Sequence, residues 1–178
     1  PPPRRAASPQ PLASPTPAPT APPPADPTAH PSPTPTPEPT PTPASKVDLA
    51  AFYASVTSQY EFGFLELASK DLLDGLYPGL SGIGAEQRLV YITQMSMHNG
   101  EGGLVQVKNS ADVAAVKAIF QARINYMVGD EENKPGAWYP GPTEQWRNNS
   151  RVVSNGNYVM MVVHENCDAI VSQFNALF

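Results

Sequence analysis

The chain has 178 residues, with 11 Lys and Arg against 16 Asp and Glu, which gives a formal net charge of −5. Of its 23 prolines, 19 lie in residues 1–45, so composition divides it into a proline-rich tail and a part, residues 46–178, that is large enough to fold around a core without a metal or disulfide. The negative charge argues against nucleic acid as a partner, and the single cysteine excludes an intramolecular disulfide.

Residues 1–45 alternate Pro with Thr, Ala and Ser and contain no Phe, Trp or Tyr. Such a sequence cannot bury a core, and proline favours the extended polyproline II conformation. We therefore expect a disordered but locally stiff linker or stalk, which would span on the order of 140 Å at about 3.1 Å per residue. An inert terminus and a proline-rich ligand for an SH3-like groove are the alternatives for this segment.

The folded part is predicted to begin with an amphipathic helix. Ser45 and Asp48 have the spacing of a capping box, and apolar residues then recur at helical spacing from Leu49 to Tyr60. Residues 61–85 give weaker signals, because three leucines suggest a short helix but a proline and several glycines interrupt it. We expect this segment to be irregular.

A hairpin and a second helix are predicted next. Residues 88–95 and 104–108 are rich in β-branched residues and flank a loop that contains Asn99-Gly100, so we expect them to pair. Ser110 is predicted to cap a helix that ends at Gly129. The apolar face of this helix would consist of Val113, Val116, Ile119, Phe120, Ile124 and Met127.

Residues 130–149 are polar and punctuated by Pro and Gly, and they are predicted to form a loop. Beyond them, residues 151–154 and 158–163 flank Asn155-Gly156, a dipeptide that favours a type I′ hairpin turn. A last helix is predicted with its cap at Asn166. The buried stripe of this helix would be Ile170, Phe174 and Leu177.

The order helix, hairpin, helix, hairpin, helix predicts an α+β domain over residues 46–178. Two strand-turn-strand-helix units can pair into one antiparallel sheet, and a shift of 54 residues aligns five identical residues between them. We expect a two-layer domain, in which an antiparallel sheet of about four strands, formed by two hairpins, is covered on one face by about three amphipathic helices.

Several motifs, taken in their order and spacing, resemble a known family. They are Leu76-Tyr77 before the first strand, residues 102–124 with Arg123 near their end, Trp138-Tyr139-Pro140 followed by Glu144-Gln145, and residues 153–159. Together they span about residues 46–178 and are similar to the domain of unknown function 4358 family of exported proteins and lipoproteins of Gram-positive bacteria. The resemblance implies export, usually with a lipid anchor on a cysteine before a flexible linker, and it carries no established activity.

Two polar groups are candidates for chemistry. His164, Glu165 and Cys167 lie where the last strand meets the last helix, where a helix dipole can favour a thiolate; the interpretation that we prefer is a structural histidine and a small buried cysteine. His98, Glu101 and His164 are candidate metal ligands, but the sequence lacks the spacing of zinc or calcium motifs. We therefore predict no catalytic residue, no metal and no cofactor.

The predicted loop 130–149 holds the candidate ligand-binding residues Trp138, Tyr139, Trp146 and Arg147. Flat aromatic rings beside an arginine can stack on sugars, peptides or a partner protein, and such residues dominate binding hot spots. The alternative is that these rings fold back as core, because long loops in small domains commonly pack on their own side chains. Burial of Trp138 and Trp146 would favour the second interpretation.

These features predict a non-catalytic binding or interaction module, displayed outside the cytoplasm on the stalk, with a protein or a cell-wall component as its partner. The chain begins at Pro1 and not at Met. We expect a removed upstream segment to have carried the export signal, and the membrane to be contacted only through an anchor upstream of Pro1.

Two alternative functions stay open. One is a small wall-associated hydrolase in which carboxylates such as Glu144 and Glu101 meet in a cleft, and the other is a structural subunit of a surface assembly.

Overall fold

The computed structural model describes residues 46–95 and 100–178, which lie in one unit, Ala44–Phe178. The predicted stalk, residues 1–45, lies outside the described residues. The helices are α1 (Leu49–Gln59), α2 (Lys70–Leu76), α3 (Val113–Val128), α4 (Pro140–Asn148) and α5 (Cys167–Asn175). The strands are β1 (Leu65–Leu67), β2 (Ala85–Thr93), β3 (Glu101–Val107), β4 (Ser150–Asn155) and β5 (Tyr158–Val163).

The strands of the described ranges form one five-stranded antiparallel sheet in the order β1-β2-β3-β5-β4. The two predicted hairpins, β2-β3 and β4-β5, are confirmed, and β3 pairs with β5 to join them. The additional strand, β1, and the helix α2 come from the segment that was expected to be irregular, and β1 extends the sheet by pairing with residues 91–93 of β2. The prediction of an α+β domain with an antiparallel sheet is therefore confirmed.

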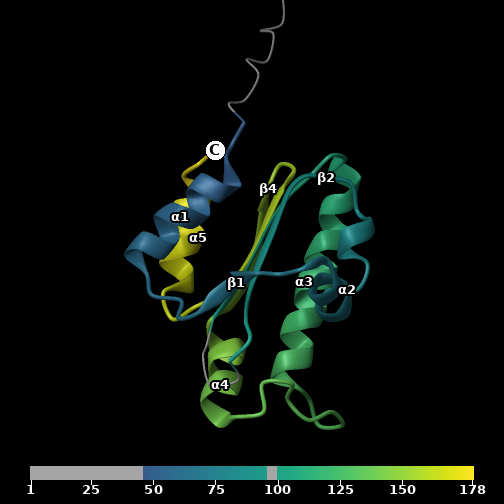
Figure 1. Ribbon diagram of the computed structural model, residues 1–178, viewed down its shortest axis with the longest axis vertical. Helices are drawn as coiled ribbons and strands as arrows, with labels where there is room; N and C mark the ends of the chain where they lie inside the picture. The colour runs from purple at the N-terminus through teal and green to yellow at the C-terminus, as the bar shows by residue number, and fades with distance from the viewer. Residues whose placement is uncertain (1–45, 96–99) are drawn as a thin grey trace, which may run out of the picture. The chain divides into compact units, whose positions relative to one another are not determined.

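The sheet is covered on both faces, so the predicted two-layer arrangement is wrong. Figure 1 shows α1 and α5 on one side of the sheet and α2 and α3 on the other. Along β5, Val159, Met161 and Val163 pack in the core that contains α3, whereas Met160 and Val162 pack in the core that contains α1 and α5. Successive residues of a strand point to opposite faces of the sheet, and in β5 the residues on both faces are apolar. Both faces must therefore be covered, which requires a third layer.

The turn between β4 and β5 differs from the predicted type. Asn155 pairs with Tyr158, so Gly156 and Asn157 are the two loop residues. Gly156 has a φ of 51°, whereas Asn157 does not have a positive φ. A positive φ at the first loop residue alone is the pattern of a type II′ turn, which favours glycine at that position. The hairpin is thus as predicted, with its turn shifted by one residue.

The predicted helix boundaries are close, but the capping side chains differ. α1 is capped by Asp48, whose carboxylate accepts two backbone N–H groups of the first turn, and Ser45 lies outside the described residues. Before α3, the side chain of Asn109 and not of Ser110 accepts an N–H group, because a short 3-10 turn precedes the helix. Gly129 ends α3 as predicted, with a φ of 70°.

α5 begins without the predicted side-chain cap. The side chain of Asn166 makes no capping hydrogen bond, and its backbone N–H instead donates to Nδ1 of His164 at 2.9 Å. Ile170 and Phe174 are buried as predicted. Leu177 lies beyond the end of the helix and is exposed, which corrects the predicted buried stripe.

Close packing of α3 on β3 leaves no room for a side chain at Gly103. A Cβ atom there would lie 2.6 Å from Cζ of Phe120, which is fully buried. We expect Gly103→Ala to lower the free energy of unfolding by about 1–3 kcal/mol, because the Phe120 ring would have to move within a packed core. Urea unfolding followed by circular dichroism measures this change.

The neighbouring substitution Gly102→Ala is the matched control, since no atom lies within 4 Å of the corresponding Cβ position. We expect it to change the free energy of unfolding by less than about 0.5 kcal/mol. Equal losses at Gly102 and Gly103 would contradict the packing explanation and would indicate a common backbone effect.

Candidate functional site

Residues 129–139 connect α3 to α4 and run along one end of the domain (Figure 1). The segment is held against the end of α3, because the N–H of Gly136 donates to the carbonyl of Tyr126 at 2.9 Å and the N–H of Ala137 donates to that of Met127 at 3.2 Å. Gly136 permits this approach, since a Cβ atom there would lie 2.4 Å from Cε1 of the Tyr126 ring. The connection is therefore fixed on α3.

Trp138 combines a strained backbone with an exposed side chain. Its φ is 61°, and it is the only residue other than glycine with a positive φ in the described ranges. The N–H of Tyr139 donates to the carbonyl of Ala137 at 2.6 Å, so Trp138 is the central residue of a γ-turn with positive φ, the rare and strained form of this turn. The indole is 86 % exposed. A backbone conformation of this kind costs about 1–3 kcal/mol, and the exposed ring adds little to the core in return. Strained residues often lie at functional sites, so Trp138 is a candidate for a role at the surface.

α4 begins directly after this turn, within the segment 130–149 that was predicted as a loop. Pro140 is its first residue, where a fixed φ suits the helix and the missing N–H is not needed. The carbonyl of Tyr139 accepts hydrogen bonds from the backbone N–H and the hydroxyl of Thr143, at 3.0 and 2.8 Å. These bonds fix the start of α4 relative to the γ-turn.

The four predicted ligand-binding residues lie in two environments. Trp138, Tyr139 and Arg147 are exposed, as a binding surface requires. Trp146 is only 3 % exposed, and the Cζ atom of Arg123 lies 5.5 Å from the centre of its ring. Trp146 therefore belongs to the core, as the alternative interpretation expected, and cannot contact a ligand at the surface.

A groove of about 560 Å³ lies between α3, α4 and β4, and we call it the α3–α4 groove. The first end of the connecting segment borders it through Asp130, and Arg147 lines it from the C-terminal end of α4. The other polar lining residues are Gln121, Asn125 and Ser150, and the apolar ones are Ile124, Val128 and Val152. A mixed lining of this kind can bind a ligand that has both polar groups and an apolar face.

The charged groups of the groove have partners within the chain. Arg147 forms an ion pair with Glu144 on its own helix. The carboxylate of Asp130 accepts hydrogen bonds from the backbone N–H groups of Glu132 and Asn133, at 2.9 and 2.7 Å. These bonds lower the pKa of Asp130 below its ordinary value, and the bond from Asn133 has the larger effect. The carboxylate is therefore ionised at neutral pH and engaged in its own turn.

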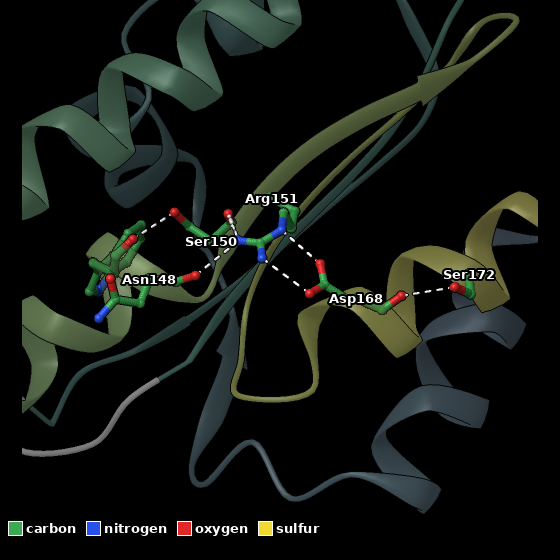
Figure 2. A network of polar contacts seen from close by, with 6 residues as sticks. Asn148, Ser150, Arg151, Asp168 and Ser172 are labelled. Carbon is green, nitrogen blue, oxygen red and sulfur yellow. Dashed lines mark hydrogen bonds and ion pairs between the residues drawn. The ribbon is translucent and has the colours of Figure 1, made fainter.

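A polar network at the end of α4 fixes this helix to the sheet (Figure 2). Arg151 on β4 pairs with Asp168 on α5, through Nε to Oδ1 at 2.8 Å and Nη2 to Oδ2 at 3.2 Å. Its Nη1 donates to the carbonyls of Asn148 and Ser150, and the hydrogen bond with Asp168 raises the pKa of Arg151. An exposed pair of this kind contributes about 0–1 kcal/mol, so its main effect is to place the end of α4 beside the groove.

Tyr77, Glu101 and Arg123 form a buried polar network beneath this end of the domain. Arg123 donates from Nε to Oε1 of Glu101 at 2.9 Å and from Nη2 to Oε2 at 3.0 Å, and the hydroxyl of Tyr77 donates to Oε1. Glu101 is 2 % exposed and Arg123 is 8 % exposed. The guanidinium also lies 6.0 Å from the ring centre of Tyr126. The network thereby ties the residue after α2 to the start of β3 and to the part of α3 that supports the connecting segment.

Sequence reasoning missed this network, although one signal for it was present. Arg123 lies three residues after Phe120, within the predicted apolar face of the helix. A charged residue at a buried position normally has a charged partner. The partner, Glu101, was not identifiable, because it lies at the edge of a predicted hairpin loop, where an exposed carboxylate is equally compatible with the sequence.

One buried phenol, Tyr77, and one half-buried phenol, Tyr53, make the stability of the fold depend on alkaline pH. Burial, and then the negative charge of Glu101, raise the pKa of Tyr77 well above its ordinary value, and burial with the neighbouring Tyr91 raises the pKa of Tyr53 to about 12. The unfolded chain loses these protons near pH 10 whereas the native state keeps them, so the stabilisation is complete below about pH 10 and decreases as pH rises above it. We expect the urea concentration at the midpoint of unfolding to decrease as the pH is raised from 9 to 11.

The substitution Tyr77→Phe removes one of these phenols. Above pH 10, the free energy of unfolding of this variant should therefore fall less steeply with pH than that of the unchanged chain. Tyr126→Phe is the control, because this side chain is exposed, and it should leave the pH dependence unchanged. Identical pH dependence in Tyr77→Phe and in the unchanged chain would contradict a role for the buried phenol.

The carboxylates that were expected to meet in a hydrolase cleft do not meet. Glu101 is buried with Arg123, whereas Glu144 lies on the surface of α4 and pairs with Arg147. Glu101 is also paired across the sheet with Val163, which places it on the opposite face from His164. The third candidate metal ligand, His98, lies outside the described residues. The residues that are described contain no group of three or more His, Cys, Asp or Glu that could hold a metal ion.

His164 and Cys167 have structural surroundings. Nδ1 of His164 accepts the N–H of Asn166, so Nε2 carries the proton and donates to the carbonyl of Glu61 at 3.0 Å. Cys167 is 1 % exposed, and burial raises the pKa of its thiol. Because the thiolate is the reactive form, both the burial and the raised pKa disfavour a nucleophilic role for this cysteine.

The chain was compared with models of known protein families, with curated proteins and with solved structures, and none of the three comparisons finds a match. The resemblance to the domain of unknown function 4358 family therefore stays a prediction. Along residues 46–95 and 100–178, no helix is long and apolar enough to cross a membrane.

Proposed function

We propose that the chain is a non-catalytic binding module, displayed outside the cytoplasm on its Pro/Thr-rich stalk, that binds a protein or a cell-wall component through Trp138 and the α3–α4 groove. The observation that carries the proposal is the exposed indole of Trp138 in a strained γ-turn. Strain persists only where the surrounding structure imposes it, and here the connecting segment is bonded to α3 on one side and to α4 on the other.

The surroundings of Trp138 support a binding role. Backbone hydrogen bonds hold Trp138 in place, so a ligand that stacks on its ring need not order the chain around it, and Trp is among the residue types enriched at binding hot spots. Tyr139, half exposed, follows directly in the chain, and Arg147 lies on the next helix beside the groove. Glu101, His164 and Glu144, three of the residues considered for catalysis, are engaged in contacts within the chain.

The stalk supports the location in the proposal. A proline-rich segment of 45 residues can hold a domain on the order of 140 Å from its point of attachment. Such a reach is useful for a module that must contact a partner across or beyond a cell wall. Export itself, and an anchor upstream of Pro1, are parts of the proposal that depend on the resemblance to the exported family.

The experiment is sedimentation of the complete 178-residue chain with envelope preparations of the organism that produces it. One preparation is wall material freed of protein, and the other is the surface-protein fraction. We expect the chain to be retained by one of them, with Trp138→Ala lowering the affinity about tenfold or more.

Leu67→Ala provides the matched control, because Leu67 is also an exposed apolar residue, 56 % exposed, but lies on the edge strand β1. It should leave retention unchanged. Absence of retention by both preparations, or equal loss in the two variants, would refute the proposed function.

A further inference from the structure

We infer that two copies of this chain join edge to edge through β4, so that their sheets continue into one antiparallel sheet across a two-fold axis at Val152. This inference goes beyond the proposed function, because it concerns an interface between copies of the chain. Three observations carry it: unpaired backbone groups on β4, the regular form of this edge strand, and a strand sequence that is complementary to itself.

Alternate residues of β4 direct their backbone groups away from the sheet. β4 lies at the edge and is hydrogen-bonded to β5 alone. The N–H of His164 donates to the carbonyl of Asn149 at 3.0 Å, and the alternation of an antiparallel ladder then assigns the bonds with β5 to residues 151, 153 and 155. The N–H and C=O groups of residues 150, 152 and 154 therefore point to the outer edge.

Most of these outward groups lack a partner. The carbonyl of Ser150 accepts a hydrogen bond from Nη1 of Arg151. The N–H and C=O groups of Val152 and Ser154 have no partner within residues 46–95 and 100–178. Donors and acceptors at every second residue, about 7 Å apart, match the repeat of another extended polypeptide strand. The partner that satisfies them is therefore a β-strand.

β4 also lacks the features that usually protect an edge strand. Natural sheets blunt their edges with very short strands, prolines or bulges. The opposite edge follows this rule, because β1 has three residues, whereas β4 has six, with no proline and no shift in its register with β5. The α3–α4 groove lies beside β4, since Ser150 and Val152 line it, so the strand is accessible from this side.

The sequence of β4 favours a second copy as the partner strand. With the axis at Val152, this residue lies opposite its own copy, and Ser150 lies opposite Ser154 of the second copy, so all three outward residues are paired. On the other face Arg151 lies opposite Val153 of the second copy. Each Arg151 keeps its own partner Asp168 (Figure 2), and no like charges lie directly opposite each other.

The neighbouring register shows why the axis lies at Val152. An axis at Arg151 would place the two guanidinium groups directly opposite each other, which is unfavourable. The axis at Val152 is perpendicular to the joined sheet, so each face continues across the interface. The α3–α4 grooves of both copies then lie on the same face of the joined sheet.

The first test is sedimentation velocity of the complete 178-residue chain at concentrations from about 10 to 200 µM, a range suited to an edge interface smaller than the roughly 1,200 Å² of stable complexes. We expect the sedimentation coefficient to rise from that of a monomer to that of a dimer. Val152→Pro removes an outward N–H that β5 does not use, so the domain should stay folded by circular dichroism. Dimerisation should weaken about tenfold or more, since each copy loses a donor at the axis.

The second test is disulfide formation in Val152→Cys after oxidation in air. In the inferred register the two Cα atoms at this position lie about 5.5 Å apart, within the range of a disulfide, and we expect a covalent dimer. Ser154→Cys is the matched control. Its copies would lie four residues apart along the paired strands, about 13 Å, and should not crosslink. The native Cys167 is buried and should not interfere.

A chain that stays monomeric over the whole concentration range would overturn the inference. Equal crosslinking in the two cysteine variants, or in neither, would overturn the register at Val152 and with it the argument from self-complementarity. A monomeric chain whose retention by the surface-protein fraction is lost in Val152→Pro would show that a strand of a different protein covers this edge, which also overturns the second copy as the occupant.

Discussion

Replacement of Arg123 with methionine is expected to lower the free energy of unfolding by about 3–5 kcal/mol, the largest effect that we predict for a single substitution. The reason is electrostatic. Arg123 donates to both carboxylate oxygens of Glu101, at 2.9 and 3.0 Å, and the carboxylate is almost fully removed from water. Without the guanidinium, a negative charge would stay buried with only the hydroxyl of Tyr77 as a partner. Urea unfolding followed by circular dichroism measures the loss.

The double variant Glu101→Leu with Arg123→Met separates charge from shape. If the loss in Arg123→Met comes from an unpaired buried charge, removal of both charged groups should restore the free energy of unfolding to within about 1–2 kcal/mol of the unchanged chain. A double variant as unstable as the single one would show that the contacts of Arg123 with the surrounding rings, and not its charge, stabilise the fold.

Elements with a regular apolar pattern were predictable from the sequence. Both hairpins and α3 follow from local patterns of apolar residues and from turn residues such as Gly129 and Gly156. The third layer was not predicted, although the uninterrupted apolar run of β5 was a signal for it. β1 was missed because it is a three-residue edge strand that depends on pairing with β2 more than on its own sequence.

The candidate site was predicted in part. The composition of the segment 130–149 indicated an aromatic surface, and Trp138, Tyr139 and Arg147 are indeed exposed. Trp146 differs because it lies in α4, where its position on the helix directs it to the core. The positive φ of Trp138 had no local signal, since Asn, Asp or Gly is the usual residue in that conformation. It results from tertiary contacts of the neighbouring residues and so requires a structure to be seen.

Substitution of Trp138 by glycine is expected to raise the free energy of unfolding by about 1 kcal/mol while removing the ring of the proposed binding surface. Glycine adopts a positive φ without steric cost, and this relief exceeds the additional entropy that glycine gives to the unfolded chain. Little packing is lost, since the indole is 86 % exposed. Thermal and urea unfolding measure the gain in stability.

Trp138→Ala is the control that separates the ring from the backbone. Alanine also lacks the indole but keeps a Cβ atom, so the strain of the γ-turn stays and no stabilisation is expected. A similar gain in both variants would show that the ring itself, and not the backbone conformation, is unfavourable in the folded protein.

The most direct test of the binding role is a paired measurement on Trp138→Gly, in which the free energy of unfolding and the retention by the envelope preparation are determined on the same sample. We expect opposite changes: greater stability than the unchanged chain and retention weakened about tenfold or more. A variant that is more stable and binds equally well would contradict the claim that the strained conformation displays this ring to a ligand.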